Sequence, residues 1–238
     1  PWLEHYTFPH EKQFGDPQHA RETARFFLDE LLRNGVTTAL CFATAHPASV
    51  DAFMAEAQTR NLRMIAGKVL QDRHSPEGLR DTDTRLSLQQ TEDLIRRWHG
   101  VDRLGYAITP RFAPTSTPEQ LHGAGELAAQ FPDVWIQSHL AENVDEIRWV
   151  HELFPKARSY LDVYDRAGLL RERAVYAHSI HLDDSDRRRM AETGSVAAVS
   201  PTSNLFLGSG FFDYEGADRC GLRYGLASDV GGGTSFSP

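Results

Sequence analysis

The sequence lacks the features that mark several special classes of protein. It contains only two cysteines, Cys41 and Cys220, so we expect neither a disulfide framework nor a cysteine-rich zinc knuckle. No apolar run approaches the ~20 residues that a membrane-spanning helix needs. The first residues, PWLEH, have neither the basic nor the apolar segment of a secretion signal. These absences predict a cytoplasmic protein with no membrane partner.

Positive charge is scarce as well. Lys and Arg total 25 against 33 Asp and Glu, which gives a formal net charge of −8. Nonspecific binding to duplex nucleic acid or to anionic membranes needs a basic surface, so we expect no nucleic-acid partner. This argument does not exclude a small nucleobase as ligand.

Repeats, low-complexity tracts and long linkers are absent, and short apolar runs alternate with longer amphipathic stretches. The apolar runs are continuous, which predicts parallel strands covered on both faces. They span 37–44, 61–70, 103–112, 134–142, 174–178, 195–200 and 222–229. Helices are predicted at 18–33, 49–59, 87–99, 118–130, 143–152, 162–168 and 184–193.

This order of elements predicts an α/β fold. A (β/α)8 TIM-like barrel is the favoured architecture, and a doubly wound sheet is the alternative. The strands are one short of eight, and the residues after Asp229 are too few for a closing helix. We therefore expect one partial barrel domain over residues 1–238, with strand one and the last helix outside the sequence.

Ionisable residues stand at the ends of the predicted strands, where a parallel barrel carries its catalytic groups. His139 and Glu142 end one run, His178 ends the next, and Asp229 ends the last. Alone, each histidine is more commonly a hydrogen-bonded structural residue, and an aspartate before glycines is more commonly a turn residue or cap. Together, two imidazoles and a carboxylate at strand ends can converge on one ion, and they suit zinc or ferrous iron.

Glu142 lies three residues beyond His139, where a turn can bring its carboxylate next to a metal-bound water without making it a ligand. From that place it would transfer protons as a general acid and base. The alternative is a structural glutamate that the dipole of the following helix stabilises. None of the three lysines ends the run 103–112, where a two-metal site would need a modified, bridging lysine. A one-metal site is therefore predicted.

Arg111 and Phe112 end the run 103–112. The guanidinium of Arg111 can make paired hydrogen bonds to a planar ligand, and the ring of Phe112 can stack on an aromatic one. The alternatives are a surface ion pair for Arg111 and core packing for Phe112. His181 forms an HxxH pattern with His178, but at a strand end only one of them should point inward. We assign the ligand role to His178 and place His181 on the substrate side.

Four motifs resemble a known family. They are SHLAEN at 138–143, AHSIH at 177–181, SPTSNLFLGSGFFD at 200–213 and SDVGGGTS at 228–235. Together they resemble the amidohydrolase superfamily, and within it the guanine deaminases. PWLEHYTFP at 1–9, DRHSP at 72–76 and PRFAPTSTPEQL at 110–121 also resemble guanine deaminases. The resemblance covers essentially the whole chain.

The resemblance implies a distorted (β/α)8 barrel and a small β-sandwich formed by the two chain ends. It implies one zinc ion, with Fe²⁺ as an alternative, held by an HxH pair, two further histidines and an aspartate. His139, His178 and Asp229 match the last three ligands. Neither an HxH pair nor the β-sandwich occurs in this sequence, so we expect the chain to be part of a longer enzyme.

The resemblance also implies roles for the remaining residues. Glu142 matches the proton shuttle, and Asp229 matches the group that takes a proton from the water. Arg111 and Phe112 match purine-binding positions, and Asn204 matches a position that shapes the pocket.

For the full-length enzyme the resemblance implies hydrolytic deamination of guanine to xanthine and ammonia, a step of purine catabolism. We expect a homodimer that binds a small-molecule purine. One alternative is a related deaminase or chlorohydrolase acting on another purine, a pyrimidine or a triazine. Another is an inert fragment or a scaffold-type relative. Because part of the ligand set is absent, we expect weak or no metal retention by these 238 residues alone.

Overall fold

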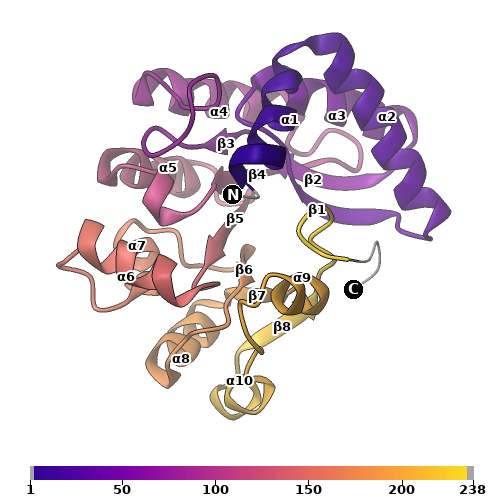
Figure 1. The fold of residues 1–238 in the computed structure, drawn as a ribbon. Coiled ribbons are helices and arrows are strands. Elements are labelled where there is room, and N and C mark those ends of the chain that lie inside the picture. The colour runs from indigo at the N-terminus through magenta and orange to yellow at the C-terminus, as the bar shows by residue number, and fades with distance from the viewer. Residues whose placement is uncertain (1–2, 235–238) are drawn as a thin grey trace. The chain divides into compact units, whose positions relative to one another are not determined.

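The computed structural model describes residues 3–234, in which strands and helices alternate along the chain as predicted (Figure 1). The chain divides into two compact units. The first unit contains Pro1–Arg111 and Thr115–Trp135, and the second contains Phe112–Pro114 and Ile136–Pro238. A single domain over residues 1–238 stays a prediction. No helix within the described residues is long and apolar enough to cross a membrane.

The first unit is a parallel sheet with helices between its strands (Figure 1). β1 pairs with β2 and β2 with β4, and the short β3 also pairs with β4. The strands are β1 (Thr38–Phe42), β2 (Arg63–Gly67), β3 (Val69–Leu70) and β4 (Gly105–Pro110). The helices are α1 (Phe8–Lys12), α2 (Pro17–Arg33), α3 (Pro47–Thr59), α4 (Thr84–Trp98) and α5 (Pro118–Gln130). One π-helical turn and two 3-10 turns lie at Leu3–Thr7, Gln13–Gly15 and Ala113–Thr115.

The second unit repeats the same pattern with a parallel sheet in the order β5-β6-β7-β8. Its strands are β5 (Trp135–Leu140), β6 (Ala174–His178), β7 (Val196–Val199) and β8 (Arg223–Leu226). Its helices are α6 (Val144–Leu153), α7 (Tyr160–Arg166), α8 (Asp184–Thr193), α9 (Pro201–Phe206) and α10 (Tyr214–Cys220). Parallel pairing brings the carboxyl ends of these strands to one edge of the sheet.

Side-chain caps set where several helices begin. The Thr117 hydroxyl accepts the Gln120 amide at 3.2 Å, and Pro118 occupies the first turn of α5, as the sequence predicts. The side chain of Asn143 caps α6 in the same way, through the amide of Asp145 at 2.8 Å. A cap of this kind contributes about 1 kcal/mol to helix stability. The cap on α6 therefore fixes where that helix starts, directly after the strand end that carries Glu142.

Two features of the strands differ from the predictions. The predicted run 61–70 is interrupted at Lys68, whose backbone amide donates to the Tyr106 hydroxyl at 3.0 Å and whose ammonium is buried against Asp81 at 2.5 Å. Burial on both faces holds for β4, in which every residue is buried, but all four residues of β8 are exposed. Within the described residues β8 pairs only with β7, so it is an open edge strand.

Candidate active site

The ends of β5 and β6 bring two predicted ligands together. The rings of His139 and His178 are stacked, with centroids 5.5 Å apart and planes inclined by 26°. The strand register explains this contact, because Leu140 pairs with His178 and His139 with Ala177. The side chain of His178 is only 1 % exposed, whereas that of His139 is half-buried.

The backbone turns sharply at both strand ends. Ala141, His178 and Ser179 adopt positive φ angles of 48°, 67° and 52°. The Ser179 amide donates to the Leu140 carbonyl at 2.8 Å, and the amide of His181 donates to the Ala141 carbonyl at 3.1 Å. These bonds hold the two turns side by side, so the strand ends form one rigid corner.

The buried side chain of Asn204, on α9, sets the tautomer of His178. Its Oδ1 lies 2.9 Å from Nδ1 of the imidazole. An amide oxygen only accepts, so Nδ1 carries a proton, and Nε2 is the ring nitrogen that Asn204 leaves for another partner. A neutral imidazole with one ring nitrogen fixed by a hydrogen bond in this way is suited to bind a metal ion through the other.

Glu142 faces that free ring nitrogen. Its Oε2 lies 3.5 Å from Nε2 of His178, and its side chain is 20 % exposed. The other oxygen, Oε1, accepts a hydrogen bond from the Ser209 hydroxyl at 3.1 Å. The predicted proton carrier is therefore next to a predicted ligand and partly open to solvent.

A buried polar cluster behind these groups was not predicted. The Tyr164 hydroxyl donates to the His139 carbonyl at 2.8 Å and lies 2.8 Å from Ser138 Oγ. Burial raises the pKa of Glu146 to about 7, repulsion from Glu142 adds to the rise, and the nearby Tyr160 hydroxyl offsets part of it. The sequence gives no clear signal of this cluster, because Glu142 precedes the cap of α6 and Glu146 lies in the first turn of that helix.

Asp229 lies beyond its strand rather than at its end. β8 ends at Leu226, and Asp229 opens a turn in which its carbonyl accepts the amides of Gly232 and Gly233 at 3.0 and 2.8 Å. Its carboxylate lies against Gly232, on the side of Ser203 in α9. Among residues 3–234, no three His, Cys, Asp or Glu side chains are close enough together to hold a metal ion. The structure thus brings together His139, His178, Glu142 and Asn204, but does not join Asp229 to them in one ligand group.

The other predicted substrate residues have partners of their own. Both terminal nitrogens of Arg111 donate to the Glu11 carboxylate, at 2.7 and 2.9 Å, so the alternative of an ion pair is what the structure shows, although the pair is largely buried. The ring of Phe112 packs edge to face against Trp149 at 6.1 Å. The ring of His181 bonds through Nε2 to the Ser209 carbonyl at 2.9 Å.

Known proteins resemble this chain over nearly its whole length. The model of the amidohydrolase family matches residues 2–237, and the chain belongs to that family. Guanine deaminase from Escherichia coli (strain K12) is 50 % identical over 236 residues, which are 99 % of this chain and 54 % of that protein. The resemblance to guanine deaminases is thereby confirmed. The chain spans about half the length of the curated relatives it matches.

Solved structures give the same result for the fold. The structure of E. coli guanine deaminase has a TM-score of 0.97 at 49 % identity, covering 99 % of this chain and 55 % of its own. Guanine deaminase from C. acetobutylicum, solved with guanine bound in its active site, has a TM-score of 0.94 at 32 % identity, covering 98 % and 56 %. The fold is that of an incomplete amidohydrolase (β/α)8 barrel, as predicted.

Proposed function

We propose that the protein containing this chain removes the amino group of guanine by hydrolysis, giving xanthine and ammonia. The observation that carries the proposal is the cluster of His139, His178 and Glu142, in a chain half identical to a guanine deaminase. Two imidazoles beside a partly exposed carboxylate are suited to hydrolysis assisted by one metal ion.

The residues present fit a divalent ion in part. Nδ1 of His178 is bonded to Asn204, which leaves Nε2 for a ligand, and the ring of His139 is stacked on it at 5.5 Å. We propose that these two side chains and Asp229 hold zinc, or Fe²⁺ in its place. When bound, such an ion supplies Lewis acidity that makes water a nucleophile near neutral pH. The other ligands that the family resemblance implies do not occur in this sequence.

Protons are moved by two carboxylates in this proposal. Asp229 takes the proton from the attacking water. Glu142 protonates a ring nitrogen of the purine and then takes back a proton from the hydroxyl group added at the ring carbon, which helps to expel ammonia. The proton held by Asp229 leaves with the amino group as that ammonia, so both carboxylates return to their starting state. Its place supports that role, because Oε2 lies beside His178 while 20 % of the side chain is open to solvent.

We assign purine binding to Arg111, Phe112, His181 and Asn204. The Glu11 carboxylate supports this role for Arg111 because it fixes the plane of the guanidinium through two hydrogen bonds. Asn204 shapes the site through the imidazole of His178.

Replacing Glu142 tests the proposal directly. In the whole protein, Glu142→Gln should keep metal content and unfolding temperature nearly unchanged and lower turnover of guanine about 10²–10⁴-fold. Glu152→Gln is the matched control, since Glu152 is exposed on α6, the helix that follows Glu142, and it should keep full activity. Full activity of Glu142→Gln would contradict the proposed role.

Two further measurements separate the alternatives. Steady-state assays on guanine, adenine, cytosine and a chlorotriazine distinguish guanine deamination from a related reaction on another heterocycle. Elemental analysis should find about one zinc or iron per chain in the whole protein; protein that folds and binds none would favour an inert relative. A homodimer and a cytoplasmic location stay predictions, and sedimentation tests the first.

A further inference from the structure

Ser209 contacts three separate parts of the candidate site. It lies between α9 and α10, and its side chain is 7 % exposed. Its hydroxyl donates to Oε1 of Glu142 at 3.1 Å, and its carbonyl accepts from the imidazole of His181 at 2.9 Å. Its amide donates to the carbonyl of Asn204 at 2.8 Å. One residue thus links the ends of β5 and β6 to α9.

These contacts close a ring around the proton carrier. Glu142 Oε2 lies 3.5 Å from His178, whose other nitrogen is bonded to Asn204. Asn204 is bonded through its backbone to Ser209, and Ser209 is bonded to Glu142. The positions of the strands place Oε2 of Glu142 near His178. The other carboxylate oxygen, Oε1, is held by the Ser209 hydroxyl.

The local sequence holds Ser209 in this position. Gly208 and Gly210 on either side have φ angles of +72° and +127°, and the second is a conformation that only glycine adopts readily. A Cβ at Gly210 would also meet the side chain of Ile180 at 3.4 Å. The Gly-Ser-Gly sequence therefore allows the chain to pass close to the end of β6 and to bury the serine there.

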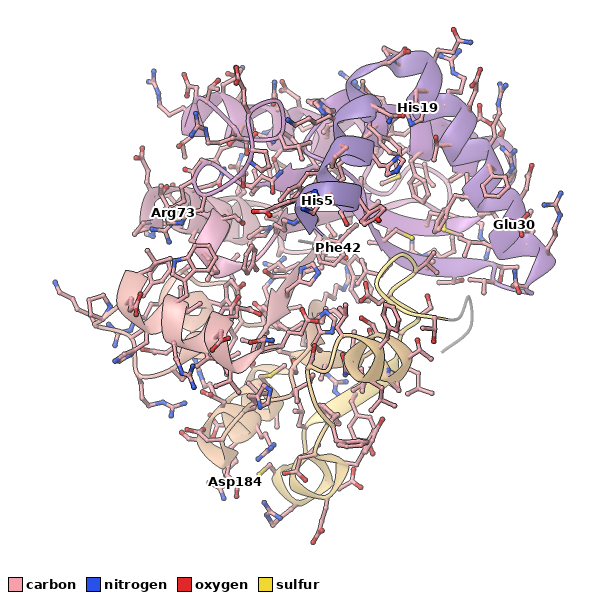
Figure 2. The ribbon with its side chains drawn as sticks, in the orientation of Figure 1. His5, His19, Glu30, Phe42, Arg73 and Asp184 are labelled. Carbon is pink, nitrogen blue, oxygen red and sulfur yellow. The ribbon has the colours of Figure 1, made fainter. Side chains whose placement is uncertain are left out.

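Ion pairs hold the far end of the same segment. The Asp213 carboxylate caps α10 and pairs with Arg187 of α8 at 2.9 Å. Arg219 of α10 donates to Asp184, which Figure 2 labels at the start of α8. Because both ends are anchored, the segment 207–213 is expected to hold Ser209 rigidly.

We infer that Ser209 is a positioning residue for Glu142, and this inference rests on the proposed function. A carboxylate at the end of a flexible side chain has several orientations, and one donated hydrogen bond to a charged oxygen selects among them. The Ser209 hydroxyl keeps Oε1 turned away from the substrate side, so that Oε2 stays beside His178 for proton transfer. Misplacement of such a group by about 1 Å costs on the order of 10²-fold in rate.

The test compares Ser209→Ala and Ser209→Thr in the whole protein. Ser209→Ala should lower kcat for guanine about 10- to 100-fold, with KM changed less than about 3-fold, because the effect is on proton transfer rather than binding. Ser209→Thr keeps a hydroxyl and should recover most of the loss. Ser195→Ala is the control, because it removes another buried serine hydroxyl, in the same unit but with contacts outside this ring, and should leave kcat unchanged.

A double-mutant cycle separates positioning from general damage to the fold. In a Glu142→Gln background, Ser209→Ala should lower the remaining activity less than about 2-fold, because the group that Ser209 positions is already gone. A full additional 10-fold loss there would overturn the inference. Unchanged kcat in Ser209→Ala alone would overturn it as well.

An infrared measurement keeps the inference testable if guanine is not the substrate. In metal-free protein with ¹³C-labelled glutamate, Ser209→Ala should shift a carboxylate stretching band that is missing in Glu142→Gln. Absence of that shift would overturn the inference whatever the substrate is. A shift in protein that fails to deaminate guanine would refute the proposed function while supporting the contact between Ser209 and Glu142.

Discussion

Replacing Glu146 by glutamine should stabilise the protein at pH 8 and have much less effect at pH 5. Glu146 lies in the first turn of α6, four residues after Glu142, and burial raises its pKa from 4.5 to about 7. Repulsion from Glu142 contributes to the rise. Within the described residues, its Oε1 is buried without a hydrogen-bond partner, so nothing at that oxygen compensates a negative charge.

The direction of the effect follows from proton binding. Between pH 4.5 and 7 the folded protein keeps this proton while the unfolded chain releases it, so the stability contributed by this group falls as pH rises through that window. A rise of two to three pKa units corresponds to a loss of about 3 kcal/mol in the free energy of unfolding. This loss is complete above pH 7 and nearly absent below pH 4.5. Glutamine has no proton to release, so Glu146→Gln removes this loss.

Urea unfolding at several pH values between 5 and 8 measures the difference. Relative to the unaltered protein, Glu146→Gln should gain about 2–3 kcal/mol more at pH 8 than at pH 5. A glutamine amide and a protonated carboxyl can also differ in stability by an amount that does not depend on pH. That amount cancels when the gain at pH 5 is subtracted from the gain at pH 8. The exposed Glu152→Gln, on the same helix, should show no such trend. An effect of Glu146→Gln that does not vary with pH would refute the argument.

Two further predictions concern the first unit, and both are measured by chemical denaturation. A Cβ added at Gly67 would lie 1.7 Å from the Ala107 carbonyl oxygen, so Gly67→Ala should lower the free energy of unfolding by about 3 kcal/mol. A Cβ added at Gly225 would have no atom within 4 Å, so the control Gly225→Ala should lower it by less than about 1 kcal/mol. Asp81→Asn leaves the buried Lys68 ammonium without its counter-charge and should cost about 3–5 kcal/mol, while replacing both with apolar residues should cost much less.

The sequence predicted elements best where local signals agree. The bounds of α5, α8 and β6 match the predicted ranges, because α5 and α8 begin at capping side chains and β6 is a short apolar run. The helices α9 and α10 were not predicted. They have only six and seven residues, too short for an amphipathic pattern, and contacts with other segments stabilise them, such as the pair between Asp213 and Arg187.

The same distinction applies to the site. The positions of His139, Glu142 and His178 at strand ends followed from the apolar runs, and their proximity followed from parallel pairing. Ser209 contacts Glu142 across 67 residues of sequence, and the burial of Glu146 depends on packing against Tyr160, so no local pattern revealed either. The predicted run ending at Asp229 was too long, because the strand stops at Leu226 and the last residues form a turn.

Backbone strain is present at the candidate site, as it is at Asn61, His74, Asp102 and Arg173 elsewhere in the chain. Left-handed backbone at a residue other than glycine costs on the order of 1–3 kcal/mol and persists only where surrounding contacts enforce it. Ala141, His178, Ser179 and Asp229 all have this conformation. Ala141 follows β5, His178 ends β6 and Ser179 follows it, and Asp229 lies in the turn after β8. Ala141 and Ser179 gain nothing from it themselves, since neither favours positive φ. The hydrogen bonds between the two strand ends hold the strained turns, and these turns carry the ring of His178 against that of His139.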